Sequence, residues 1–246
     1  MTPPLVLLHA FPLSASMWRA QQDLSDVVLA PDQRGFGAKP LGTDEPSLDV
    51  VADDVAALLD SRGLDRVVLG GLSMGGYVAM AFARRHPQRL AGLILADTKM
   101  TADPEAGVAN RLRIADLLDA DPSSSVLLDD VYPKLLGVTT KRDSPDVVER
   151  VTGWVKAAPA AGASWAQRAM AARPDSADTL RSVAVPALVI VGDEDELSPP
   201  SDAQAMAAAL LDAELVVIPG AGHLTAVEAP EAFNAAVSSF LSRLVG

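Results

Sequence analysis

A glycine-rich turn around one serine is the feature of this sequence that most directly suggests chemistry. The run Gly71-Leu72-Ser73-Met74-Gly75-Gly76 follows a short apolar stretch and opens a helical pattern. A strand-to-helix turn with small residues around a serine is typical of a nucleophile, because the strained backbone raises the hydroxyl above the sheet. The free N–H groups at the helix N-terminus then lie beneath a developing oxyanion. The pattern predicts that Ser73 is a catalytic nucleophile.

A serine hydroxyl reacts poorly until a base removes its proton, and histidine is the usual base. The chain contains three histidines. His86 follows two arginines at a helix end, which is typical of a solvated helix terminus. His9 ends a buried apolar run, which indicates an oriented structural residue beside the site. His223 follows an apolar run within a flexible Gly-Ala-Gly-His loop, and we expect it to be the base.

The base needs a carboxylate on its far nitrogen to hold the tautomer and stabilise the imidazolium. The run Gly192-Asp193-Glu194-Asp195-Glu196 directly follows an apolar stretch. Asp193 is placed to bond the local backbone, whereas Asp195 lies at the apex of the loop, so Asp195 is the predicted acid. Asp97 ends the preceding strand and is the alternative, because a parallel sheet can deliver a carboxylate from either strand.

The elements that must position these residues are short apolar strands and amphipathic helices in alternation. Continuous apolar runs bounded by Gly, Pro and Asp are typical of strands buried on both faces. Six such runs occur at residues 5–8, 27–30, 66–69, 92–96, 187–191 and 215–218. Helical patterns occur at 47–63, 74–85, 201–211 and 230–244. The alternation predicts an α/β fold with a mostly parallel, doubly wound sheet of about six strands.

The alternation breaks between residues 99 and 178, where helical runs replace strands. These runs cover residues 111–118, 124–136, 145–156 and 164–172. We therefore expect a core of residues 1–98 and 179–246 with a helical cap, 99–178, inserted over the carboxyl ends of the strands, where ligands bind in such sheets.

Large side chains of the expected cap could form a substrate pocket. Trp154 and Trp165 are the candidate substrate-binding residues, with packing against the sheet as the alternative. A carboxylate on the substrate would need a nearby cation. Arg150, Lys156 and Arg168 are available for that purpose, although exposed helix cations are the alternative description of all three.

Composition narrows the classes of partner. The 246 residues include 20 Lys and Arg against 32 Asp and Glu, for a formal charge of −12, and no cysteine. The acidic excess argues against a nucleic-acid partner, and the lack of cysteine excludes disulfides and thiolate chemistry. The N-terminal run does not resemble a signal peptide, and no apolar run approaches the roughly 20 residues that span a bilayer. We expect a cytoplasmic protein with no membrane partner, and the oligomeric state stays open.

The chain order Ser73, Asp195, His223 is that of the α/β-hydrolase triad. Two further motifs, Leu8-His9-Ala10-Phe11-Pro12 and Asp32-Gln33-Arg34-Gly35-Phe36-Gly37, occur in the same order along the chain. With them the sequence resembles the α/β-hydrolase-fold serine hydrolases. It is similar to the group of small carboxylesterases, haloperoxidase-like proteins and 3-oxoadipate enol-lactonases.

The resemblance implies roles for further residues. The backbone N–H groups of Phe11 and Met74 occupy the positions that form the oxyanion hole in the family. Asp32 and Arg34 match residues that brace the loop beside the hole. Ala10 stands where the family usually has glycine, which adds a methyl group near the hole without removing an N–H.

The function implied by this resemblance is hydrolysis of a small carboxylic ester or lactone through an acyl-enzyme, without a metal or organic cofactor. A serine at the turn disfavours the aspartate-nucleophile reactions of the same fold. A C–C bond hydrolase, a thioesterase and a perhydrolase are alternatives on the same triad. A non-catalytic small-molecule binder is the competing class, because fold alone does not imply catalysis.

Overall fold

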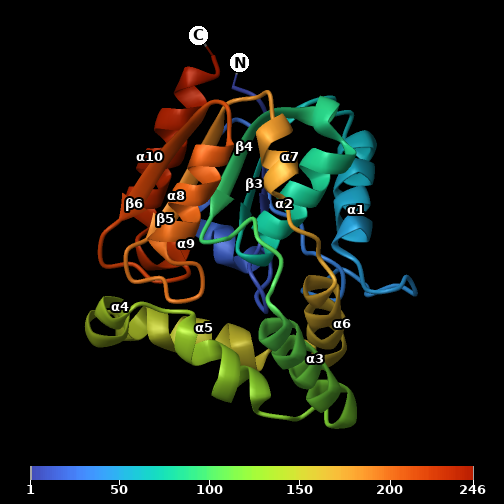
Figure 1. Cartoon of the computed structure of the whole chain (residues 1–246). Coiled ribbons are helices and arrows are strands. Elements are labelled where there is room, and N and C mark those ends of the chain that lie inside the picture. The colour runs from blue at the N-terminus through green and yellow to red at the C-terminus, as the bar shows by residue number, and fades with distance from the viewer. Residues whose placement is uncertain (1, 246) are drawn as a thin grey trace.

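The computed structural model describes residues 2–245 and builds them around one parallel sheet. The six strands lie in the order β2-β1-β3-β4-β5-β6 (Figure 1). They are β1 (Leu5–Leu8), β2 (Val28–Leu29), β3 (Val67–Leu72), β4 (Leu90–Ala96), β5 (Ala187–Gly192) and β6 (Ala213–Ile218). The central strands β1, β3 and β5 are buried along their whole length, as expected for a parallel sheet covered on both faces. The predicted fold class is therefore confirmed.

Two helical layers cover the sheet. The core helices are α1 (Leu48–Ser61), α2 (Met74–Arg85), α7 (Ala177–Ser182), α8 (Pro200–Ala209), α9 (Thr225–Glu228) and α10 (Pro230–Arg243). Helices α1, α2, α7 and α8 form one contiguous layer. Helix α10 packs on β5 and β6, and it contacts α9 and the 3-10 helix Ala15–Gln21 in the other layer. A further 3-10 turn, Pro87–Arg89, leads into β4.

Local sequence signals explain where the first core helix begins and ends. The Ser47 side chain caps α1 by accepting a hydrogen bond from the Asp49 N–H at 3.2 Å. Gly63 follows the helix with a φ of 64°, a conformation that glycine adopts without a steric penalty. The apolar residues of α1 recur at helical spacing and are buried, so the helix begins and ends within two residues of its predicted limits.

Strand β3 differs from the sequence-based prediction because it continues to Leu72, three residues beyond the predicted end. Glycine is a weak strand former, so the sequence favoured a stop before Gly70. Pairing overrides this preference: Gly70 lies opposite Leu7 of β1 and Ile94 of β4. A Cβ on Gly70 would lie 2.8 Å from the Leu7 side chain, so a glycine here permits close packing in the centre of the sheet.

Between β4 and β5 the described chain forms helices only. They are α3 (Glu105–Ala120), a π-helical turn (Leu127–Val131), a 3-10 turn (Tyr132–Lys134), α4 (Val138–Asp143), α5 (Pro145–Lys156), α6 (Ala160–Ala171) and α7. Helices α3 to α6 lie beyond the carboxyl ends of the strands (Figure 1). Helix α7 instead packs against α2 and α8 in the core layer. The run predicted at 124–136 is broken into two turns, because Pro133 lacks the N–H that a continuous α-helix needs.

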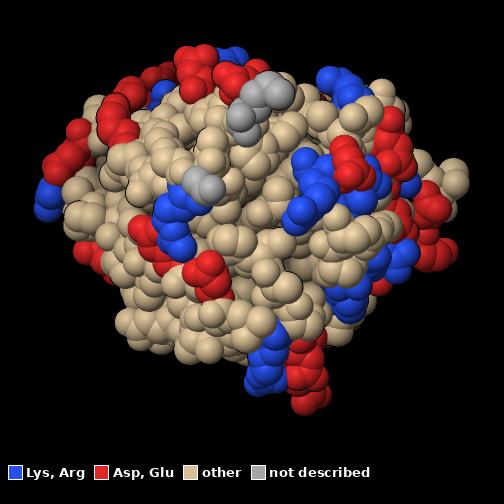
Figure 2. All heavy atoms as spheres, turned by 90° about the horizontal axis from the view of Figure 1, so that it is seen from above, with Lys and Arg blue, Asp and Glu red and all other residues tan. Residues whose placement is uncertain are grey.

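The opposite end of the molecule carries the chain termini. Figure 2 shows that acidic and basic side chains lie next to one another around the margin of this face, while its centre is largely uncharged. Within residues 2–245, no helix has both the length and the apolar character needed to cross a membrane.

Candidate active site

The turn between β3 and α2 holds Ser73 in a strained conformation. Its φ is 55° and its ψ is −112°, a region that non-glycine residues rarely adopt. Two glycines make the turn possible. A Cβ on Gly71 would lie 2.1 Å from the Gly75 carbonyl oxygen, and a Cβ on Gly75 would lie 2.1 Å from the Leu8 carbonyl oxygen. The small residues around the serine therefore serve close backbone packing, and the hydroxyl is left at the carboxyl edge of the sheet.

The Gly75→Ala variant tests this packing. Because the new methyl group would overlap the backbone of β1, we expect the free energy of unfolding to fall by about 3 kcal/mol. Gly153→Ala is the matched control, since a Cβ there meets no atom within 4 Å. In α5 it is expected to raise the free energy of unfolding by about 0.5–1 kcal/mol. Urea denaturation of both variants gives the comparison, and equal effects would contradict the proposed role of the close contact.

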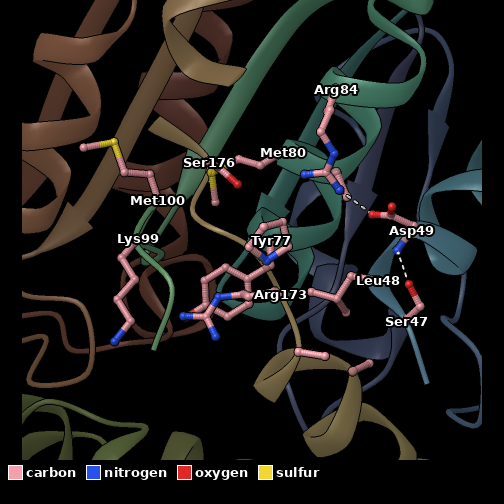
Figure 3. Close-up of a pocket in the computed structure, with 14 residues that line it drawn as sticks. Ser47, Leu48, Asp49, Tyr77, Met80, Arg84, Lys99, Met100, Arg173 and Ser176 are labelled. Carbon is pink, nitrogen blue, oxygen red and sulfur yellow. Dashed lines mark hydrogen bonds and ion pairs between the residues drawn. The ribbon is translucent and has the colours of Figure 1, made fainter. Parts of the chain in front are cut away.

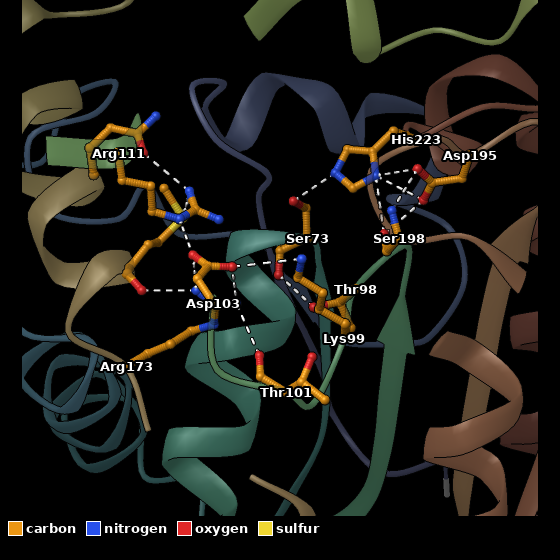
Figure 4. Close-up of polar contacts among 12 residues, drawn as sticks. Ser73, Thr98, Lys99, Thr101, Asp103, Arg111, Arg173, Asp195, Ser198 and His223 are labelled. Atoms are coloured by element: carbon orange, nitrogen blue, oxygen red, sulfur yellow. Dashed lines mark hydrogen bonds and ion pairs between the residues drawn. The ribbon is translucent and has the colours of Figure 1, made fainter. Parts of the chain in front are cut away.

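The structure brings the three predicted triad residues together from three separate segments (Figure 4). The Ser73 Oγ lies 2.8 Å from the His223 Nε2. The His223 Nδ1 lies 2.8 Å from Oδ2 and 2.9 Å from Oδ1 of Asp195. His223 follows β6 and Asp195 follows β5, so all three side chains gather at the carboxyl edge. These contacts form one continuous line of hydrogen bonds that ends at the serine hydroxyl.

The Asp195 carboxylate is held by its own loop as well as by the imidazole. Oδ1 accepts hydrogen bonds from the N–H groups of Leu197 at 2.8 Å and Ser198 at 3.1 Å. The Ser198 hydroxyl donates to Oδ2 at 2.8 Å, and its Oγ lies 3.3 Å from the His223 Nδ1. Burial alone would raise the pKa of the Asp195 carboxyl, but His223 and the Ser198 donors hold the pKa below its ordinary value. Asp195 therefore stays ionised beside the imidazole.

Sequence reasoning missed Ser198. Its position three residues after Asp195 could have indicated it. In loops, an aspartate carboxylate commonly accepts hydrogen bonds from the N–H and hydroxyl groups of residues that follow closely in the chain.

The alternative acid, Asp97, has other partners. Its Oδ1 accepts from the Gly192 N–H at 3.1 Å. Its Oδ2 accepts from the Thr225 N–H at 3.1 Å and the Thr225 hydroxyl at 2.5 Å. Burial, and then the nearby negative charge of Asp195, raises the pKa of the Asp97 carboxyl well above its ordinary value. Asp97 thus ties the start of the acid loop to the segment after His223, while Asp195 is the carboxylate that contacts the imidazole.

His9 lies beside the site as a fully buried residue. Its Nδ1–H donates to the Ala10 carbonyl at 3.0 Å, and its Nε2 accepts from the Gln33 N–H at 3.0 Å. The Gln33 side chain donates back to the His9 carbonyl at 2.7 Å. This arrangement uses a neutral imidazole and orients the loop that leads to Phe11, as the sequence predicted for a structural histidine.

His9 makes the folded protein sensitive to acid. Burial is the largest influence and lowers the pKa of the imidazole from 6.5 to about 4. Below pH 6.5 the unfolded chain binds a proton that the folded protein accepts only near pH 4. The free energy of unfolding should therefore fall between those pH values, by up to about 3 kcal/mol. Urea denaturation at several pH values should show this loss in the wild type and not in His9→Gln; parallel curves would contradict it.

The two residues predicted to form the oxyanion hole, Phe11 and Met74, have unused backbone donors. Phe11 lines the same cavity as Ser73 and His223, and Met74 is the first residue of α2. Within residues 2–245, the turn, loop and cap hydrogen bonds use neither the Phe11 N–H nor the Met74 N–H. Both donors are therefore available to a ligand oxygen.

Asp32 and Arg34 connect loops near the start of the chain. The Asp32 carboxylate accepts from the N–H groups of Ala15 at 2.8 Å and Ala38 at 2.9 Å. Arg34 donates to Asp54 of α1 with its Nε at 2.5 Å. These contacts fit the bracing role that the family resemblance implies.

A cavity of about 220 Å³ lies over Ser73 and His223. Its other lining residues come from the core, from the loop after β4 and from the helical segment. They are Phe11, Tyr77, Lys99, Asp103, Gly107, Asn110, Arg111, Ile114, Asp130, Val131, Lys134, Leu135, Gln167, Met170 and Leu197. The helices beyond the carboxyl edge therefore contribute most of the wall.

The two tryptophans predicted to bind substrate do not line this cavity. Trp165 is buried, and its Nε1–H donates to the Asp44 carbonyl at 2.9 Å, which fixes the ring against the core. Trp154 borders a different cavity beside Phe36, and Arg150 lies over its ring at 5.9 Å from the centroid. The sequence predicted helices in this segment but not the direction in which their side chains point.

The cations also differ from those considered in the sequence. Arg150, Lys156 and Arg168 do not line the cavity, whereas Lys99, Arg111 and Lys134 do. The sequence did not predict these three cations as neighbours, because they come from three different segments of the chain.

Figure 3 shows the residues that line a second cavity, of about 250 Å³. Both cavities are lined by Tyr77 and Lys99. The guanidinium of Arg173 lies over the Tyr77 ring, 4.0 Å from its centroid. The stacked pair lies at the boundary between the two cavities.

Known proteins resemble this chain along nearly its whole length. A curated protein, 3-oxoadipate enol-lactonase 2 of Acinetobacter baylyi, is 27% identical over 245 residues, covering 98% of this chain and 89% of that protein. A thermophilic esterase from Thermogutta terrifontis, solved with malate bound, is 40% identical with a TM-score of 0.94, covering 98% of this chain and 90% of that one. The enol-lactonase from Burkholderia xenovorans is 26% identical with a TM-score of 0.88, covering 98% and 92%.

The family assignment rests on the length of the match as well as on the fold. Residues 5–236 match the alpha/beta hydrolase family, which includes the whole sheet and the segments that carry Ser73, Asp195 and His223. This chain belongs to the alpha/beta hydrolase family.

Proposed function

We propose that this protein is a serine hydrolase that cleaves a carboxylic ester or lactone through an acyl-enzyme. The observation that carries the proposal is the continuous line of hydrogen bonds from Asp195 through His223 to the Ser73 hydroxyl. A buried carboxylate, an imidazole and a serine in this order are the groups that activate a hydroxyl for acyl transfer.

Acylation begins with the tautomer of His223. The His223 Nδ1–H donates a hydrogen bond to the Asp195 carboxylate, so the lone pair of Nε2 faces the Ser73 hydroxyl. His223 removes the hydroxyl proton as Oγ attacks the substrate carbonyl. The resulting imidazolium is stabilised by Asp195 and then protonates the departing alkoxide. For a lactone, the same step opens the ring and leaves the alcohol on the acyl chain.

Deacylation uses the same residues with water as the nucleophile. His223 takes a proton from the water as the water oxygen attacks the acyl-serine carbonyl. Collapse of this second tetrahedral intermediate releases the carboxylic acid, and His223 returns a proton to Ser73. The steps therefore require only protein groups and water.

Backbone donors stabilise the oxyanion in both steps. We assign this role to the N–H groups of Phe11, which lines the cavity with Ser73, and Met74, which follows Ser73 in the chain. Neither N–H group has a turn or loop acceptor within residues 2–245. Removal of one such donor in other enzymes costs about 2.7–4 kcal/mol of transition-state stabilisation. The backbone conformation at these two residues therefore matters more than their side chains.

The helical segment between β4 and β5 is proposed to act as a cap domain. Residues of α3, α6 and the turns between Leu127 and Lys134 line the cavity over Ser73. Their position limits the access of water, which strengthens electrostatic interactions with the bound substrate. Helix α7 packs with the core, so we place the cap in α3 to α6.

The substrate class follows from chemistry and from the relatives together. A serine nucleophile with backbone oxyanion donors suits an activated carbonyl, and the related proteins named above are an esterase and two enol-lactonases. Thioester hydrolysis, C–C bond hydrolysis and the reaction of an ester with hydrogen peroxide to give a peracid are alternatives that the same groups could support, and thioesters form a further arm of the test.

Steady-state assays with p-nitrophenyl esters from acetate to octanoate, followed by simple lactones and thioesters, test the proposal. We expect saturable turnover with one preferred acyl length, set by the cavity over Ser73. If no member of the panel is hydrolysed while a ligand still raises the melting temperature, the protein is a small-molecule binder instead.

A further inference from the structure

The charges around the cavity over Ser73 differ from those of the chain as a whole. The protein carries a formal charge of −12, yet the charged residues on the cavity wall are three cations, Lys99, Arg111 and Lys134, and two acids, Asp103 and Asp130. The pairing of the two acids decides how much positive charge faces a ligand.

Asp103 is neutralised by arginines. Its carboxylate forms a bidentate pair with Arg173, at 2.7 Å and 2.8 Å, and also accepts from the Arg111 Nε (Figure 4). Burial alone would raise the pKa of the Asp103 carboxyl, but the two arginines hold it well below its ordinary value. The Arg173 side chain is 5% exposed and that of Asp103 is 4% exposed. This buried cluster therefore fixes one negative charge between two positive ones.

Asp130 is likewise occupied, because it pairs with Arg113 outside the cavity wall. Both acids of the wall are therefore already paired with arginines. The Lys99 Nζ lies 3.6 Å from the Asp103 Oδ1, an oxygen already bonded to Arg173. Among residues 2–245, the carboxylates of this wall form ion pairs with other cations, and none of these pairs includes Lys134.

The two lysines come from different parts of the fold. Lys99 lies in the loop after β4. This loop borders the Ser73 turn, because the hydroxyl of the neighbouring Thr98 donates to the Ser73 carbonyl at 2.9 Å. Lys134 belongs to a turn of the helical segment. A ligand over Ser73 would therefore meet one ammonium group from the core and one from the cap.

We infer that the substrate of this site carries a carboxylate in addition to the ester or lactone carbonyl, and that Lys99 and Lys134 bind it. The inference rests on the proposed function and specifies its substrate class as monoesters of dicarboxylic acids or carboxylate-bearing lactones. Arg111 and Arg173 position the wall through Asp103, because their donors are already used there. The cationic wall also offsets the repulsion that an anion meets from the acidic surface.

A pair of esters that differ only in charge tests this inference. Ethyl hydrogen glutarate carries a carboxylate, whereas the ethyl ester of glutaric acid monoamide is nearly the same shape and neutral. Wild type should have a kcat/KM for the anionic ester at least about tenfold higher, the value of one charged hydrogen bond. High salt should reduce this ratio through screening.

Two neutral substitutions and one control locate the effect. Lys99→Met and Lys134→Met should each lower the ratio of the two kcat/KM values about tenfold, mainly through KM for the anionic ester. Lys156→Met removes the same charge from the end of α5, away from this cavity, and should leave the ratio and the activity unchanged. Thermal unfolding of each variant verifies that it is folded.

The outcomes separate this inference from the proposed function. If wild type hydrolyses both esters equally, or if Lys156→Met changes the ratio as much as Lys134→Met, the carboxylate site is overturned while the serine hydrolase stands. If neither ester nor any member of the ester panel is hydrolysed, both proposals fail. The salt dependence in wild type gives an answer even if Lys99→Met does not fold.

Discussion

The Ser73→Ala variant is expected to lose about 10⁴- to 10⁶-fold of kcat for ester hydrolysis. The hydroxyl is the only group of the triad that forms a bond to the acyl carbon, so its removal abolishes the covalent route. The oxyanion donors that we propose, the Phe11 and Met74 N–H groups, stay in place, and such donors in comparable enzymes leave a small rate above that of water. Fold stability should change little, because the variant removes one hydroxyl from a partly exposed position.

Initial rates with the best ester of the panel, wild type beside variant, measure this loss. Ser61→Ala is the control, because Ser61 is exposed and its hydroxyl donates only to the Leu58 carbonyl of α1. Mass spectrometry of the rapidly quenched reaction should find the acyl group on the peptide that contains Ser73. A variant that kept more than a tenth of the wild-type rate would rule out Ser73 as the nucleophile.

The Asp195→Asn variant is expected to lose about 10³- to 10⁴-fold of kcat, by a different mechanism. An asparagine N–H pointing at the His223 Nδ1 would favour the tautomer that carries its proton on Nε2. That proton would face the Ser73 oxygen, so the imidazole could no longer act as a base. The substitution also removes the negative charge that stabilises the imidazolium.

Comparison with Asp97→Asn distinguishes the two buried acids. Asp97 bonds Gly192 and Thr225 rather than His223, so its amide variant should lower kcat less and lower the free energy of unfolding more. Pre-steady-state kinetics and urea denaturation of both variants provide the two readouts. The assignment of the acid would be reversed if Asp97→Asn caused the larger loss of kcat in a protein of wild-type stability.

Several features of the fold were predictable because they depend on local patterns. Buried parallel strands have continuous apolar sequences. Helix α1 has both a capping serine and a terminating glycine. The strand boundaries were less predictable, since pairing partners determine where a strand ends. Gly70 and Gly71 illustrate this, because their place in β3 is decided by β1 and β4 on either side.

The residues of the candidate site likewise differ in how far local sequence patterns predict them. Ser73 was identifiable from its turn, and His223 from its loop after a strand, because each signal lies within a few neighbouring residues. The sequence predicted Asp195 as the acid but left Asp97 as the alternative, since both acids follow strands that end at the same edge. Only the folded chain shows which carboxylate faces the imidazole.

The sequence by itself determined the parallel sheet, the helical segment between β4 and β5 and the identity of the residues at the carboxyl edge, because those depend on hydrophobic spacing and turn chemistry along the chain. Tertiary structure alone decided the wall of the cavity. It turned Trp165 toward the Asp44 carbonyl and brought Lys99, Arg111 and Lys134 together from three segments. Side-chain direction on a short helix is fixed by what packs against it, and that information lies in contacts between residues far apart in the sequence.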